Sequence, residues 1–199
     1  MEVDSVLIPY LRHRFRDSEH LTVVEGDVLT ADLAQWGPAI VAGNLPYYIT
    51  SPILERVFRM ADAWMGSTFL VQKEVAERLT ASPGSRDYGY LTVQTNVFAI
   101  PEYLFTVGRG AFSPPPKVDS AVVRLRPRNA EADFGISDRD SFLRFASAAF
   151  RQKRKTLRNN LVGVYGRERL EGAGLSMRAE QLSVGELNEI FRRLEGAVS

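Results

Sequence analysis

Four consecutive residues, Asn44-Leu45-Pro46-Tyr47, combine an amide, a turn-forming proline and an aromatic ring. They follow residues 39–43, an apolar run typical of a short buried strand, and precede residues 48–52, which are typical of a helix start. Open α/β sheets bind their ligands at the carboxyl ends of strands, where this turn would lie. The combination could hold a flat nitrogen base still while its exocyclic amine is alkylated.

The chemistry of such an amine explains why these residue types would be needed. An exocyclic amine is a poor nucleophile because its lone pair is delocalised into the ring, and two hydrogen-bond acceptors would oppose that delocalisation. The Asn44 side-chain oxygen and the Leu45 carbonyl could be those acceptors. Pro46 would keep the turn rigid, and the ring of Tyr47 offers a stacking surface. The alternative is an ordinary β-turn whose aromatic side chain packs inward.

The elements around this turn alternate between strand and helix. Apolar spacing predicts three helices: one over 5–16, one that begins at a Thr50 or Ser51 cap, and one over 73–80. It predicts strands over 21–25, 39–43, 67–71, 91–100 and 118–125. The strand over 118–125 alternates as a strand near a sheet edge does. This order predicts a mostly parallel sheet covered by helices on both faces.

The pattern changes after Pro127. Residues 128–135 are polar without a period, which is typical of a linker, and every later periodic segment is helical. Ser137 and Asp140 resemble a capping box, as do Ser183 and Glu186. We therefore expect a sheet domain over 1–128 and a small all-helical domain over 136–199.

The composition excludes several classes of protein. The 199 residues include no cysteine and only two histidines, which excludes a disulfide framework and a thiolate or histidine metal cluster, so we expect no metal. No apolar run is long enough to span a bilayer, and the acidic N-terminus is unlike a signal peptide. We expect a cytoplasmic monomer without a membrane partner.

Four ordered stretches carry a resemblance to a known family. Residues 44–52, Asn-Leu-Pro-Tyr-Tyr-Ile-Thr-Ser-Pro, resemble the ribosomal RNA adenine dimethylases, which use S-adenosylmethionine. Residues 26–29 resemble the family's acidic loop, and residues 112–120 its late aromatic-proline loop. Residues 150–161 and 178–183 resemble the helical domain of the KsgA (RsmA) branch.

The resemblance implies both the fold and the reaction. The fold would be a Rossmann-like S-adenosylmethionine-dependent methyltransferase sheet with a small C-terminal all-helical domain. The substrate would be two adjacent adenosines of small-subunit (16S) ribosomal RNA in a pre-ribosomal 30S particle, each dimethylated on its exocyclic amine during subunit maturation. Related dimethylases act on large-subunit RNA and share the first three stretches, so that substrate is an alternative.

The resemblance also implies roles for individual residues. Glu2 would accept hydrogen bonds from the ribose hydroxyls of S-adenosylmethionine, and Asp27, next to Val28, would accept from its adenine amine; Asn44 would border the same cofactor. The ring of Phe112 would face the flipped target base opposite Tyr47. The alternatives are an exposed terminal Glu2, an ordinary turn at Asp27 and a Phe112 in the core.

A basic run in the helical region suggests the nucleic-acid contact. Five cations lie between 151 and 158, and at 100° per residue four of them would share one helix face. Like charges on one face favour a polyanionic partner such as RNA, although a solvated helix face is the alternative. The expected RNA-binding residues are Lys117, Arg151, Lys153, Arg154, Lys155 and Arg158.

One family element has no counterpart in this sequence. The family carries a glycine-rich turn after its first strand, upstream of the position that Glu2 holds here, and no Gly-x-Gly stretch of this chain follows a strand and opens a helix. We therefore expect the first strand and the glycine-rich loop to be missing and cofactor binding to be impaired. A non-catalytic module that binds ribosomal RNA is a second hypothesis, and a DNA adenine methyltransferase a third.

Overall fold

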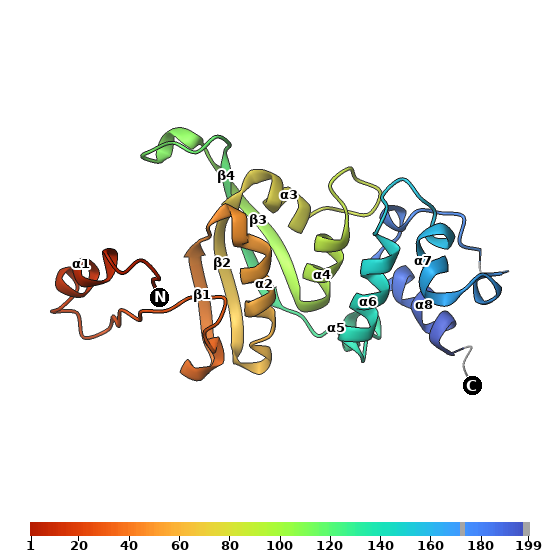
Figure 1. Ribbon diagram of the computed structural model, residues 1–199, viewed down its shortest axis with the longest axis horizontal. Helices are drawn as coiled ribbons and strands as arrows, with labels where there is room; N and C mark the ends of the chain where they lie inside the picture. Colours follow the sequence, from red (N-terminus) through yellow and green to blue (C-terminus); the bar gives the residue numbers. More distant parts are fainter. Residues whose placement is uncertain (172–173, 197–199) are drawn as a thin grey trace.

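The computed structural model describes residues 1–171 and 174–196, and its centre is a four-stranded sheet (Figure 1). The strands are β1 (Ala39–Asn44), β2 (Trp64–Gln72), β3 (Ala99–Val107) and β4 (Ser120–Pro127). Their order is β1-β2-β4-β3, with β1 and β2 parallel and the other two pairs antiparallel. The prediction of a mostly parallel sheet was therefore wrong. The edge position expected for residues 118–125 was also wrong, because β4 lies between β2 and β3.

Eight α-helices and several 3-10 turns complete the described part of the chain. The helices are α1 (Leu7–Arg14), α2 (Thr50–Phe58), α3 (Lys73–Leu79), α4 (Tyr90–Phe98), α5 (Ala130–Phe134), α6 (Arg139–Ala149), α7 (Leu157–Tyr165) and α8 (Val184–Gly196). Two 3-10 turns matter for the site, η2 (Tyr47–Ile49) and η4 (Arg109–Ala111). None of the described helices is both long and apolar enough to cross a membrane.

Helices cover one face of the sheet, and Figure 1 shows α2 and α3 in front of the strands. Phe69, Val71 and Val123 of the covered face are fully buried in a core with the apolar side of α2. The opposite face is more open: Ile40 is 70% exposed on β1 and Phe105 is 56% exposed on β3. Among the described residues, helices therefore cover only one face of the sheet, and the prediction that both faces are covered was wrong. The prediction that the strand over 39–43 is buried was also wrong.

Residues 91–100, predicted as a strand, form α4 and only the first two residues of β3. The side chain of Thr92 accepts from the Gly89 amide at 3.2 Å and donates to the Arg78 carbonyl at 2.6 Å, which fixes the start of the helix. The helix packs on the sheet core on one side and on the C-terminal helices on the other. Burial all round explains its strand-like composition, because tertiary packing overrides β-propensity.

Two expectations near the N-terminus also change. Residues 21–25 form no regular strand and contribute only an isolated parallel bridge between Glu2 and Glu25. Neither Thr50 nor Ser51 caps α2, because the cap residue is Ile49 and the Thr50 hydroxyl instead donates to the Pro46 carbonyl at 3.2 Å.

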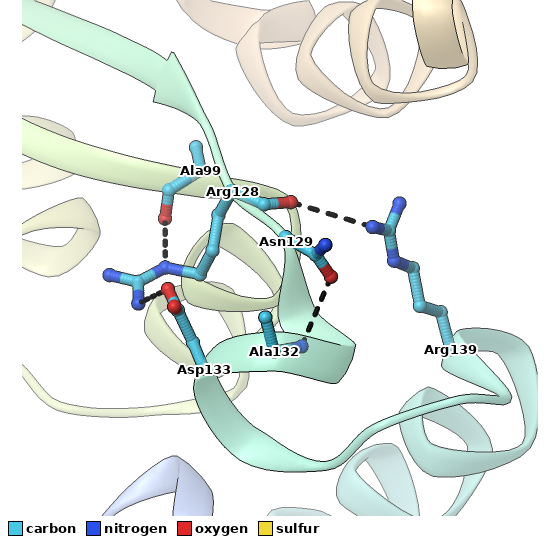
Figure 2. A network of polar contacts seen from close by, with 6 residues as sticks. All are labelled: Ala99, Arg128, Asn129, Ala132, Asp133 and Arg139. Atoms are coloured by element: carbon cyan, nitrogen blue, oxygen red, sulfur yellow. Dashed lines mark hydrogen bonds and ion pairs between the residues drawn. The ribbon is translucent and has the colours of Figure 1, made fainter.

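The predicted linker 128–135 contains α5 and is tightly bonded, as Figure 2 shows. Arg128 donates from Nε to the Ala99 carbonyl at 3.2 Å and pairs with Asp133 at 2.6 Å. The Asn129 side chain caps α5 by accepting from the Ala132 amide at 3.1 Å. A polar segment without a period is thus ordered by side-chain contacts. The domain boundary at 128–136 remains a prediction, because α4 packs both on the core of the sheet and on the core of the C-terminal helices.

The C-terminal helices begin at polar caps. Asp138, rather than Ser137, caps α6 by accepting from the Ser141 amide at 2.9 Å, so the predicted box was displaced by one residue. The box at Ser183 is confirmed, since Glu186 accepts from the Ser183 amide at 2.8 Å and donates its own amide to the Ser183 hydroxyl at 3.3 Å. Apolar faces of α6, α7 and α8 then meet in a core that includes Phe142, Leu161 and Leu187.

Candidate active site

The Asn44–Tyr47 turn lies at the carboxyl end of β1, as the sequence predicted. The Leu45 amide donates to the Leu70 carbonyl of β2 at 3.0 Å, which continues the parallel pairing into the turn. The buried Thr50 hydroxyl contacts the Pro46 and Tyr47 carbonyls at 3.2 and 3.4 Å. The turn is therefore held from both ends by groups that point away from solvent.

An open hollow of about 350 Å³ lies against this turn, a size within the range of small-ligand sites. Its walls come from two segments far apart in the sequence, the turn after β1 and the loop between β3 and β4. The lining residues are Asn44, Leu45, Pro46, Tyr47, Phe112, Pro114 and Pro116. The fold thus brings the two predicted stacking residues, Tyr47 and Phe112, to one site.

The polar group of the hollow is the Asn44 side chain. It is exposed and forms no hydrogen bond with any residue that the structure describes. The other walls are mainly proline and aromatic rings, which offer flat apolar contact and few polar groups that could bind the ligand in place of Asn44. The arrangement can bind a planar base between rings while an amide oxygen accepts from its amine.

Three of the predicted cofactor residues, Glu2, Asp27 and Val28, lie in the N-terminal segment, which Figure 1 shows on the side of β1 away from β2. Glu2 is half-buried, and its Oε1 accepts from the Val3 and Asp4 amides, each at 2.9 Å. Asp27 is exposed, and its Oδ1 accepts from the Leu29 amide at 2.8 Å. The structure brings Glu2 next to the 24–26 segment but does not place Glu2, Asp27 or Val28 among the residues lining the hollow.

The basic run does not form one helix face, so that prediction was wrong. Residues 150–156 form the turn between α6 and α7, because α6 ends at Ala149 and the Thr156 side chain caps α7. The cations Arg151, Lys153, Arg154, Lys155 and Arg158 are all exposed, and none forms an ion pair with a described carboxylate. Lys117 is likewise exposed.

Lys153 connects this turn to the sheet part of the molecule. Its Nζ donates to the Arg86 carbonyl, and both residues line a hollow of about 810 Å³ together with Arg78. Acidic residues also line it, among them Glu74 and Asp87. Cations from two separate segments therefore share one surface.

Sequence reasoning missed two residues behind the hollow. The Ser120 hydroxyl lies 2.7 Å from the Tyr47 hydroxyl, and the Asp119 carboxylate accepts from the Arg109 amide at 3.0 Å. Both belong to the stretch that carried the family resemblance, but only the aromatic residue and the lysine in it were given roles. For Ser120, a polar side chain at the buried start of a strand was the available signal. No group of three or more His, Asp or Glu in the described residues could hold a metal ion.

Comparison with known proteins identifies what the chain is similar to. The profile of the ribosomal RNA adenine dimethylase family matches residues 1–195. The protein of Chlorobium phaeobacteroides called ribosomal RNA small subunit methyltransferase A is 43% identical over 197 residues, which is 98% of this chain and 71% of the relative. The protein of the same name from Pseudomonas putida is 40% identical over 92% of this chain and 71% of the relative.

Two solved structures share the fold. A dimethyladenosine transferase from Plasmodium falciparum superposes with a TM-score of 0.80 at 24% identity over 95% of this chain and 78% of that one. The 23S rRNA methyltransferase ErmE gives a TM-score of 0.71 at 28% identity over 98% of this chain and 80% of that one. These similarities confirm the Rossmann-like methyltransferase fold with a helical C-terminal part.

Proposed function

The chain belongs to the ribosomal RNA adenine dimethylase family, and we propose that it dimethylates the exocyclic amine of each of two adjacent adenosines in small-subunit (16S) ribosomal RNA. The methyl donor is S-adenosylmethionine, and the weaker binding expected from the missing glycine-rich turn stays a prediction. Relatives named for the small subunit are about 40% identical to this chain, whereas the 23S methyltransferase of known structure is 28% identical. This difference favours the small-subunit substrate over the large-subunit alternative.

The N-terminal carboxylates fit the nucleoside part of the donor. The second oxygens of Glu2 and Asp27 have no partner among the described residues, so each can accept from a hydroxyl or an amine, and Val28 offers an apolar contact. When bound, the donor supplies a methyl group on a positively charged sulfur. We assign Glu2, Asp27 and Val28 to this role, with Asn44 bordering the same space.

The turn after β1 acts on the target amine. In the first transfer, Asn44 Oδ1 and the Leu45 carbonyl accept from the two N–H groups of the adenine amine, which keeps its lone pair out of the ring and directed at the methyl group. In the second transfer the one remaining N–H donates to one of these acceptors. Pro46 fixes the spacing of the two acceptors, while the rings of Tyr47 and Phe112 enclose the flipped base. One amine proton is released for each methyl group gained, and positioning supplies most of the rate.

The exposed cations of the α6–α7 turn bind the RNA backbone. Four of them, together with Arg158 of α7, lie within eight residues without carboxylate partners in the described chain, so phosphates are their natural counterions. Lys117 extends the same role to the loop that carries Phe112. We further propose that the protein acts as a cytoplasmic monomer on an assembling 30S particle.

The observation that carries the catalytic assignment is the unpaired Asn44 amide in a hollow walled by two aromatic rings. Its test is Asn44→Ala, measured by methyl transfer to a small-subunit RNA fragment and by binding to the same RNA. Methyl transfer should fall at least a hundredfold, while the affinity for RNA changes less than threefold. Asn96→Ala is the control, because the Asn96 amide is already bonded to the Thr92 carbonyl of α4. Near-normal turnover by Asn44→Ala would contradict the assignment.

A further inference from the structure

The two aromatic walls of the hollow are anchored at adjacent residues of one strand end. The Tyr47 hydroxyl lies 2.7 Å from the Ser120 hydroxyl, although the two residues are 73 positions apart in the sequence. We propose that Ser120 is a positioning residue that fixes the Tyr47 ring against the target base, and that Asp119 does the same for the loop carrying Phe112. This inference rests on the proposed function, because it concerns the same base-binding site.

Ser120 is well suited to act as a fixed anchor. It is fully buried at the first position of β4, and its backbone pairs with Gln72 of β2 on one side and Val107 of β3 on the other. A strand residue that is paired on both sides cannot shift without breaking the sheet. The hydroxyl of Ser120 therefore offers Tyr47 a partner at a constant place.

Tyr47 needs such an anchor because its backbone alone does not orient its ring. The hydrogen bonds that hold the turn involve the Leu45 amide and the Pro46 and Tyr47 carbonyls, and none of them touches the ring. The ring is half-buried and faces an open hollow, so rotation about its side-chain bonds would be free on that side. The bond to Ser120 holds the far end of the ring.

Asp119 fastens the opposite wall. Its carboxylate accepts from the Arg109 amide at 3.0 Å, which closes the loop around η4, and Phe112 directly follows η4. Its carbonyl accepts from the Lys73 amide at 3.0 Å at the start of α3. Two successive residues thus tie both aromatic walls to the same strand end, so the gap between the rings is set by the sheet rather than by the loops.

The test removes the hydrogen bond between Tyr47 and Ser120. Ser120→Ala removes one hydroxyl, Tyr47→Phe removes the other, and the double variant removes both, each in the full chain. Each single variant should lower kcat about tenfold to a hundredfold, with the KM for RNA changed less than threefold. The double variant should be no worse than either single one, because all three lack the same bond. Ser120→Thr keeps a hydroxyl and should restore part of kcat.

The chain offers a matched control. Tyr103 and Thr106 form a second tyrosine–hydroxyl pair, at 2.6 Å on β3, outside the hollow. Tyr103→Phe removes a bond of the same chemistry and should leave kcat unchanged. If Ser120→Ala is fully active while Tyr47→Phe is not, the Tyr47 hydroxyl acts on the substrate directly and the proposal is overturned.

A second measurement separates this inference from the proposed function. In tyrosine-labelled protein without RNA, NMR couplings should show the Tyr47 side chain in one χ1 rotamer, and Ser120→Ala should average these couplings between rotamers while those of Tyr103 stay unchanged. Failure of the unaltered chain to methylate RNA would contradict the function but leave this result standing. A Tyr47 side chain that already averages between χ1 rotamers in the unaltered protein would overturn the positioning role. Tyr47→Phe tests the same bond if Ser120→Ala does not fold.

Discussion

The Gly26 backbone amide donates to the Glu2 carbonyl at 2.9 Å, and the Glu2 amide donates to the Val24 carbonyl at the same distance. These two bonds hold Glu2 beside the segment that ends at Asp27. Each of the two carboxylates uses one oxygen to accept from backbone amides of its own turn. Backbone bonds therefore orient both carboxylates and leave the second oxygen of each for a ligand.

The first prediction concerns this pair of carboxylates. Asp27→Ala should weaken binding of S-adenosylmethionine by roughly tenfold to a hundredfold, because it removes a charge-assisted hydrogen bond worth about 1.5–3 kcal/mol. Isothermal titration calorimetry on the full chain measures the change. Asp32→Ala is the control, since Asp32 also accepts from a backbone amide in the same segment but has no assigned role. Equal loss in both variants would point to damage of the segment rather than to a lost contact.

The second prediction concerns the exposed cations of the α6–α7 turn. Arg154→Gln should weaken RNA binding at low salt and reduce the slope of log affinity against log salt by about one, because one phosphate contact is lost. Fluorescence anisotropy with an RNA fragment at several salt concentrations measures the slope. Arg193→Gln, which removes an exposed cation of α8, should leave it unchanged. An unchanged slope in Arg154→Gln would mean that the turn is only a solvated surface.

Local motifs were predictable from the sequence, whereas the partners of each element were not. The turn at Asn44, the helix at Lys73 and the box at Ser183 depend on neighbouring residues, and the structure confirms all three. The partner of β4 depends on contacts far away in the chain. Alternation along residues 118–125 could not reveal that strands pair on both of its sides.

The basic run illustrates the same limit within the site. Charge spacing predicted one helix face, yet the cap at Thr156 starts a new helix in the middle of the run. The capping preference of threonine was visible in the sequence but was outweighed by the charge pattern. The bond between Tyr47 and Ser120 could not be predicted, because it depends on the pairing of β4 with β2.

The third prediction tests the junction drawn in Figure 2. The Arg128 side chain is 15% exposed; it pairs with Asp133, donates to the Ala99 carbonyl and lies 4.8 Å from the Phe134 ring centroid. Arg128→Ala should lower the free energy of unfolding by about 2–3 kcal/mol in urea titrations. Arg128→Lys should recover only part of the lost free energy of unfolding, because an ammonium group cannot reproduce the planar set of donors of a guanidinium group.

A second arginine pair provides the control for this prediction. Arg124 and Glu102 also lie 2.6 Å apart, but their side chains are 47% and 41% exposed. Arg124→Ala should therefore cost less than about 1 kcal/mol. Equal costs for Arg124→Ala and Arg128→Ala would show that the burial of Arg128 does not matter.

The fourth prediction concerns acid. Hydrogen bonds from Ser141 lower the pKa of Asp138 below 3.8, and bonds from Ser183 lower the pKa of Glu186 below 4.5. A lowered pKa means that folding favours the carboxylate. This stabilisation is therefore present when the pH is above the ordinary pKa values, and it is lost as the pH falls through the lowered pKa values of the folded protein. Asp138→Asn keeps a cap that does not titrate, and it should make the loss of stability shallower as pH falls below about 4. Urea titrations across that range measure it, and a parallel curve would contradict the assignment.

The last prediction concerns Tyr88, which is 2% exposed and whose hydroxyl has no hydrogen-bond partner among the described residues. Tyr88→Phe keeps the ring beside Phe150, at 6.0 Å between centroids, and removes only the unpaired hydroxyl. The free energy of unfolding should stay the same or rise by about 1 kcal/mol. Tyr165→Phe is the matched control and should destabilise the protein, because the Tyr165 hydroxyl donates to Glu195 at 2.9 Å.

Alkaline titration gives an independent readout for Tyr88. Burial, with a smaller contribution from Glu186, raises the pKa of Tyr88 to about 12 from an ordinary 10.0. A raised pKa means that folding favours the neutral phenol, so this contribution to stability is complete below pH 10 and is lost as pH rises toward 12. Ultraviolet titration should show a tyrosine that ionises near pH 12 and is missing in Tyr88→Phe. A Tyr88 that ionises near pH 10, or a Tyr88→Phe variant as unstable as Tyr165→Phe, would mean that its hydroxyl is solvated or bonded.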